Sequence, residues 1–138
     1  MIYISVIKIP KGGGYMKLTD SEWAVMEVLW TEDDHGPDYA LGEITDELKT
    51  VKHWNKNTVL TYLTRMAKKG IVSINRSSDK PYSAAITKEE CAREERQELL
   101  NKVYSGATGD LISAFLKESK ISKKEVERLK KLLDDMEV

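Results

Sequence analysis

The sequence of 138 residues predicts an α+β fold that is mostly α-helical. We expect an N-terminal domain of three helices and one hairpin, followed by a C-terminal arm of three helices. Two observations lead to this prediction. Apolar residues recur at helical spacing in six segments, three of which have a capping-box motif at their start. Two short apolar segments, 71–76 and 81–86, flank a polar turn, which is typical of a β-hairpin.

The first helix is predicted to begin after Thr19, because Thr19 and Glu22 have the spacing of a capping box. Its apolar stripe ends at Trp30, which we expect to pack in the core. The acidic loop 32–37 follows, and its Gly-Pro pair cannot continue the helix. We interpret His35 in this loop as a solvated residue rather than a metal ligand.

The second helix is predicted to begin near Asp38 or Ala40 and to end at a short turn over 50–53. The third helix begins after Asn55, a good N-cap residue, and ends at Gly70, which suits a C-cap. At 100° per residue, one side of this helix is apolar and the opposite side is polar or basic. The apolar side consists of Val59, Leu63 and Met66.

Positive charge is concentrated around the third helix and the hairpin. Residues 52–80 include seven basic residues and one acidic residue, whereas the rest of the chain has fifteen basic and twenty-two acidic residues. A basic local field of this kind attracts phosphates. A helix with a polar, basic outer face that leads into a hairpin with a basic turn predicts a winged helix-turn-helix that binds double-stranded DNA.

The candidate DNA-binding residues lie on the outer face of the third helix and at the hairpin turn. The short polar side chains let the helix approach base edges, and the cations suit phosphate contacts in the major groove or from the wing. These residues are Lys56, Asn57, Thr58, Thr61, Arg65, Lys68, Arg76 and Lys80.

The C-terminal helices are predicted to form a dimerisation arm over residues 89–138. We expect a long charged helix to residue 105, a break at Gly106 and Gly109, a short apolar helix and a last helix capped by Ser122. These segments have too few apolar residues to bury a core alone, and small helical pieces are commonly stabilised by oligomerisation. The candidate dimerisation residues are Leu111, Ile112, Phe115, Val126, Leu129, Leu132 and Leu133.

The winged-helix domain is then expected over residues 16–88. Residues 1–15 are interpreted as a non-native or disordered leader, because Lys11-Gly12-Gly13-Gly14 before Met16 looks like a translated ribosome-binding site. The alternative is a native N-terminal strand. Intact mass of the protein expressed from its native locus distinguishes these two hypotheses.

Several classes of function are not expected. The sequence contains no phosphate-binding loop, no spaced metal-ligand set and no nucleophile motif, so we expect neither an enzyme nor a bound cofactor or metal. The single Cys91 fits a reducing compartment such as the cytoplasm and is interpreted as a packing residue. No apolar run approaches the roughly 18 residues needed to span a bilayer, so we expect no membrane insertion.

Residues 17–136 resemble the penicillinase-repressor family of bacterial regulators. The matching features are Leu18-Thr19-Asp20-Ser21-Glu22-Trp23, Trp54 with Thr58-Val59, Lys68-Lys69-Gly70, and Asn101-Lys102-Val103-Tyr104. The resemblance implies a homodimer on a pseudo-palindromic operator that represses a downstream gene, such as a resistance or peptidase-sensor operon. It also implies that a membrane sensor protease triggers cutting of the arm at an Asn-Phe bond in some members.

The sequence departs from this family pattern at three points. One lies in the third helix, where Leu60 occupies a position at which relatives can have a basic residue, so the operator preference can differ. The candidate cleavage site is Ala114 and Phe115, so the Phe is present but Ala114 stands where Asn is expected. Copper-responsive members have a C-terminal Cys-x-Cys pair, whereas Cys91 is the only thiol here, and one soft ligand does not build that copper site.

Two alternatives remain open at this stage. The basic face of a winged helix can instead dock an acidic protein partner. A repressor of the same family can also be induced by a small molecule or by a different protease.

Overall fold

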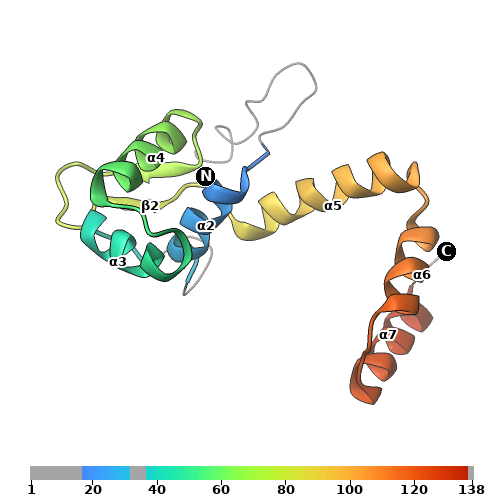
Figure 1. The fold of residues 1–138 in the computed structure, drawn as a ribbon. Helices are drawn as coiled ribbons and strands as arrows, with labels where there is room; N and C mark the ends of the chain where they lie inside the picture. Colours follow the sequence, from blue (N-terminus) through green and yellow to red (C-terminus); the bar gives the residue numbers. More distant parts are fainter. Residues whose placement is uncertain (1–16, 32–36, 137–138) are drawn as a thin grey trace. The chain divides into compact units, whose positions relative to one another are not determined.

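The computed structural model describes residues 17–31 and 37–136, and it confirms a mostly helical α+β fold with one small antiparallel sheet. Figure 1 shows the order of the elements along the chain. These are α2 (Asp20–Leu29), α3 (Leu41–Lys52), α4 (Lys56–Lys68), β1 (Val72–Ile74), β2 (Tyr82–Ala84), α5 (Lys88–Tyr104), α6 (Thr108–Glu118) and α7 (Lys123–Asp135).

The chain divides into two compact units, a first unit that reaches to Arg96 and a second unit that starts at Gln97. The first unit contains α2, α3, α4 and the hairpin, which Figure 1 shows gathered together. The leader hypothesis for residues 1–15 and the interpretation of His35 lie outside the described residues.

The first unit has a single apolar core, to which each of its elements contributes. The predicted apolar stripes of α2, α3 and α4 are buried. Ile86, which follows the hairpin, is buried as well. One buried polar contact ties the hairpin exit to α2, because the Trp30 indole Nε1–H donates to the Ile86 carbonyl oxygen at 2.9 Å. The largest fully buried side chains are Met26, Leu29, Ile44, Leu48, Leu63, Met66, Ile71, Val25 and Val59.

The connection between α3 and α4 is shorter than the sequence predicted. The predicted turn at 50–53 is wrong, because α3 continues to Lys52 and the reversal is made at His53, whose φ is 55°. A left-handed residue there ends the helix and turns the chain within one position. Beside it, the Trp54 and Tyr62 rings stack at 4.5 Å, which fixes the start of α4 against its own second turn.

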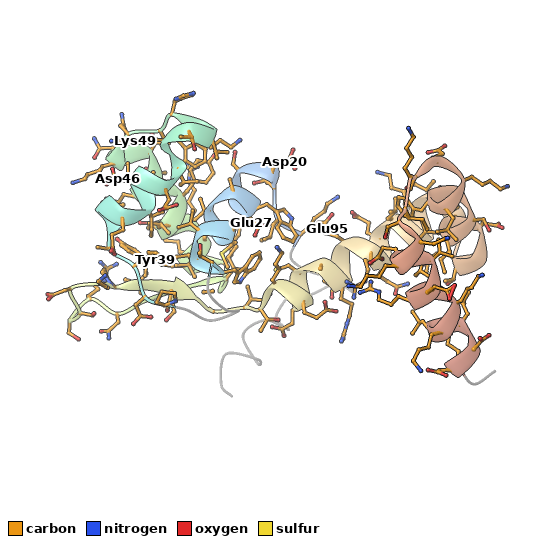
Figure 2. The ribbon with its side chains drawn as sticks, turned by 90° about the horizontal axis from the view of Figure 1, so that it is seen from below. Asp20, Glu27, Tyr39, Asp46, Lys49 and Glu95 are labelled. Carbon is orange, nitrogen blue, oxygen red and sulfur yellow. The ribbon has the colours of Figure 1, made fainter. Side chains whose placement is uncertain are left out.

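The hairpin pairs Val72 with Ala84 and Ile74 with Tyr82 in antiparallel register. A third segment joins it, because Tyr39 forms an isolated bridge with Tyr82. The Tyr39 amide donates to the Tyr82 carbonyl oxygen at 2.8 Å, and the Tyr82 amide donates to the Tyr39 carbonyl oxygen at 3.0 Å. Figure 2 shows Tyr39 beside the hairpin, so β2 is held between β1 and the segment before α3.

The second unit contains the end of α5 and the helices α6 and α7. Ser105 and Gly106 both have positive φ, and the Gly106 amide donates to the Leu100 carbonyl oxygen, which ends α5 with a left-handed cap. The predicted break at Gly109 is wrong, because Gly109 lies in the first turn of α6. Within the part of the chain that the structure describes, neither α6 nor α7 has a buried residue.

Cys91 lies in the first turn of α5 and is buried in the core of the first unit. Burial, with the nearby carboxylates of Glu90, Glu95 and Glu94, raises the pKa of the Cys91 thiol from 9.0 to about 12. The folded protein therefore holds the thiol proton more tightly than the unfolded chain. This contribution to stability is fully present below the unfolded pKa and is lost as pH rises from 9.0 to about 12.

We expect Cys91 to react with iodoacetamide at pH 8 roughly a thousandfold more slowly in the folded protein than in denaturant, because the thiolate is the reactive form. Mass spectrometry of timed reactions measures this rate. The Cys91→Ser variant is the control for other modified sites. Equal rates in the folded and denatured protein would contradict burial of the thiol.

Candidate nucleic-acid interface

Helix α4 is held in the first unit by one apolar side and presents a polar side outward. Val59, Leu63 and Met66 are fully buried and fix its rotation about its own axis. Its start is fixed by Asn55, whose Oδ1 accepts from the Thr58 amide at 2.9 Å. The predicted N-cap and apolar stripe of this helix are therefore both present.

The predicted DNA-binding residues of α4 lie mainly on its outward side. Lys56, Asn57, Thr61, Arg65 and Lys68 are exposed. Only Thr58 is half-buried. The arrangement gives a polar surface with a cation at each end of the helix.

One of these side chains already makes a hydrogen bond within the helix. The Thr61 hydroxyl donates to the Asn57 carbonyl oxygen at 2.9 Å. Its hydrogen is therefore used, whereas its oxygen lone pairs and its methyl group remain available for contacts outside the helix.

Three cations of α4 are free to meet anions. Within residues 17–31 and 37–136, the Lys56, Arg65 and Lys68 side chains have no ion-pair partner. By contrast, Lys49 and Asp46 on the surface of α3 form an ion pair, with 3.3 Å between Lys49 Nζ and Asp46 Oδ1. Figure 2 shows both residues on that helix. Of the two helices α3 and α4, α4 therefore has most of the positive charge that has no ion-pair partner among the described residues.

Lys69 has a structural partner that its sequence context did not reveal. Its Nζ lies 2.5 Å from Glu22 Oε2, and the Glu22 side chain is only 5% exposed. The other carboxylate oxygen of Glu22 accepts from the Thr19 amide at 2.9 Å, which closes the predicted capping box. Glu22 therefore connects the start of α2 to the end of α4, and Lys69 contributes less free positive charge than the sequence count suggests.

Lys80, predicted to contact DNA from the hairpin, also has a partner. Its Nζ donates to Glu43 Oε2 at 2.9 Å, and Glu43 Oε1 accepts from the Ala40 amide at 2.8 Å. The hydrogen bond from Ala40, followed by that from Lys80, lowers the pKa of the Glu43 carboxyl, and the Glu43 partner raises the pKa of Lys80. The exposed pair joins the hairpin to the start of α3.

Arg76 lies at the exposed beginning of the hairpin turn, and no ion pair holds it among the described residues. The turn is shaped by short polar side chains. Asn75 Oδ1 accepts from the Ser77 amide at 3.2 Å and from its hydroxyl at 2.8 Å, and Ser78 Oγ accepts from the Lys80 amide at 3.0 Å. A structured turn that presents one free guanidinium suits contact with a phosphate.

The described residues contain no group of three or more His, Cys, Asp or Glu side chains placed to hold a metal ion. Across residues 17–31 and 37–136, no helix has both the length and the apolar character required to cross a membrane. The candidate interface is a helix whose polar groups and cations face outward, next in sequence to a hairpin with Arg76 at its turn, and these cations have no ion-pair partner among the described residues.

Comparison with known proteins gives one family and several relatives. The model of the penicillinase repressor family matches residues 18–135. Methicillin resistance regulatory protein MecI of Staphylococcus aureus (strain N315) is 28% identical over 122 residues, which cover 86% of this chain and 94% of that protein. The penicillinase repressor of Staphylococcus aureus is 28% identical over 122 residues, covering 88% of this chain and 94% of that protein. The penicillinase repressor of Bacillus licheniformis is 24% identical over 120 residues, covering 86% and 91%.

Substitution of the adjacent lysines Lys68 and Lys69 should have different effects on stability, because only Lys69 has an ion-pair partner among the described residues. We expect Lys69→Met to lower the free energy of unfolding by about 1–3 kcal/mol, because the buried Glu22 carboxylate loses a charged partner. We expect Lys68→Met to change it by less than about 0.5 kcal/mol, since this exposed side chain has no partner. Urea unfolding followed by circular dichroism measures both, and equal stability of the two variants would contradict the role of Glu22.

Proposed function

The chain belongs to the penicillinase repressor family, and we propose that it is a dimeric repressor of transcription that binds DNA through α4 and the hairpin. The observation that carries this proposal is the outward side of α4, where Lys56, Arg65 and Lys68 have no ion-pair partner among the described residues. These cations surround short polar side chains on a helix that is fixed by its buried side. This combination is what a helix needs to enter the major groove.

In this proposal the residues of the interface have different roles. Asn57 and Thr61 face base edges, while Lys56, Arg65 and Lys68 contact phosphates. The hairpin serves as the wing, and Arg76 reaches the sugar-phosphate backbone from its turn. Thr58 and Lys80 lie at the margin of this surface, with Thr58 half-buried and Lys80 engaged by Glu43.

The second unit is proposed to form the dimer. Its helices leave large apolar side chains exposed, including Phe115 at 56%, Leu132 at 60% and Leu133 at 60%. These exposed side chains, with Leu111, Ile112, Val126 and Leu129, would be covered by the same surface of a second copy. A two-fold dimer places two α4 helices on two half-sites, which predicts a pseudo-palindromic operator.

Repression then follows from occupancy of a promoter, where the bound dimer excludes RNA polymerase. Two relatives are named as a methicillin resistance regulatory protein and a penicillinase repressor, so we expect the repressed genes to form a resistance operon. Binding DNA requires a location in the cytoplasm. Release requires loss of dimerisation, because one monomer provides only half of the contacts.

Cutting of the arm is one proposed route to release. A cut between Ala114 and Phe115, in response to a membrane sensor protease, would separate α7 from α5. Both residues lie within α6, so this helix must unwind before a protease can bind the chain in extended form. A small molecule or a different protease that weakens the same apolar contacts would have the same effect.

Fluorescence anisotropy with duplex DNA from the upstream intergenic region of its own gene, and with a scrambled duplex, tests the proposal. We expect roughly a thousandfold preference for the native duplex at physiological salt. We expect Arg65→Ala to weaken native binding by about tenfold, and to reduce the salt slope by about 0.9 for each phosphate that the arginine neutralises in the wild type. Arg93→Ala, an exposed arginine on α5, is the matched control.

Two results would contradict this proposal. Equal, weak binding to both duplexes would favour a module that docks an acidic protein partner. Unchanged affinity in Arg65→Ala would remove α4 from the interface.

The dimer has its own test in α7. We expect the double variant with Leu129→Asp and Leu132→Asp to be a monomer, because two carboxylates cannot be buried without partners. Sedimentation velocity measures the change. Lys124→Asp, on the same helix and exposed, should leave the dimer intact. A dimer that survives the double substitution would place the interface elsewhere.

A further inference from the structure

Helix α4 exposes one large apolar side chain among its polar and basic residues. Leu60 is 39% exposed, although it directly follows the fully buried Val59. In the described part of the first unit, the only other exposed large apolar side chain is Val51 at the end of α3. A single exposed leucine is ordinary on a protein surface. Leu60 is of interest because it lies on α4, the helix that is proposed to enter the major groove.

The neighbours of Leu60 on the helix are residues of the proposed interface. Residues three and four positions apart share a helix face, which places Leu60 beside Lys56, Asn57 and Thr64. Lys56 and Asn57 are exposed, and Thr64 is half-buried. When α4 lies in a major groove, Leu60 is therefore at the edge of the surface that faces the bases.

A leucine buried against DNA has few suitable partners. It can neither donate to a phosphate nor pair with the heteroatoms of a base edge, and covering those groups with an apolar side chain leaves them without hydrogen bonds. The apolar group that a base pair presents in the major groove is the C5-methyl of thymine. The adjacent Thr61 adds to this preference, because its hydroxyl hydrogen is already donated to the Asn57 carbonyl oxygen at 2.9 Å.

We propose that Leu60 is a specificity-determining residue that selects a thymine in each operator half-site by contacting its C5-methyl group. This inference rests on the proposed function and adds to it a base preference at one position. Thr61 supplies a second methyl beside Leu60. The free cations of α4 then provide affinity that does not depend on sequence, and Leu60 provides discrimination that hardly depends on salt.

The test uses the full chain and a tight-binding duplex selected by it from a random duplex library. Each thymine of that duplex is replaced in turn by deoxyuridine, which removes only the methyl group. We expect one position in each half-site where this replacement weakens binding about fourfold, corresponding to about 0.8 kcal/mol for one buried methyl. In Leu60→Ala the same replacement should have a clearly smaller effect, because only the methyl groups of Thr61 and of the introduced alanine remain, while Val51→Ala should retain the wild-type response.

The outcomes separate this inference from the proposed function. Selection of no preferred duplex would mean that the chain is not a sequence-specific repressor. A preferred duplex that tolerates deoxyuridine at every position would overturn the role of Leu60 and leave the repressor intact. The same would follow if Leu60→Ala and the wild type responded equally to deoxyuridine.

Discussion

The buried carboxylate of Glu22 is the constraint on which the orientation of α4 depends. One of its oxygens caps α2 through the Thr19 amide, and the other meets the Lys69 ammonium group at the end of α4. A carboxylate that is withdrawn from water needs such partners, because burial without them is costly. Helices α2 and α4 are therefore held together by the Glu22 carboxylate, in addition to the apolar core that they share.

This constraint divides the basic residues into two kinds. Lys69 and Lys80 have acidic partners on other elements, so they position α4 and the hairpin. Lys68 and Arg76 are close to them in sequence but have no ion-pair partner in the described part of the chain. Neighbouring cations of similar chemistry thus have different roles. The net charge of residues 52–80 therefore overstates the positive charge that is available to a phosphate backbone.

Sequence reasoning predicted the features that depend on local patterns. The capping box of α2, the N-cap at Asn55 and the apolar stripe of α4 are all encoded within a few residues. It missed the pairs Lys69–Glu22, Lys80–Glu43 and Tyr39–Tyr82, which join residues that are far apart in sequence and have no shared signal. The left-handed His53 was missed as well, since α3 could equally have ended a turn earlier. The proposed contacts of the second unit are still predictions, because a partner for its apolar side chains lies outside a single chain.

The bridge between Tyr39 and Tyr82 has a consequence for how such proteins diverge. Both of its hydrogen bonds are made by the main chain, so they do not depend on which side chains extend from the hairpin turn. Among the described residues, the Arg76 and Asp79 side chains make no hydrogen bond or ion pair, unlike Ser77 and Ser78, so these two positions can change during evolution with little loss of folding stability. After gene duplication, sister proteins can change the charge that the hairpin turn presents in few mutational steps, because the main-chain bridge keeps the hairpin in place whatever those side chains are.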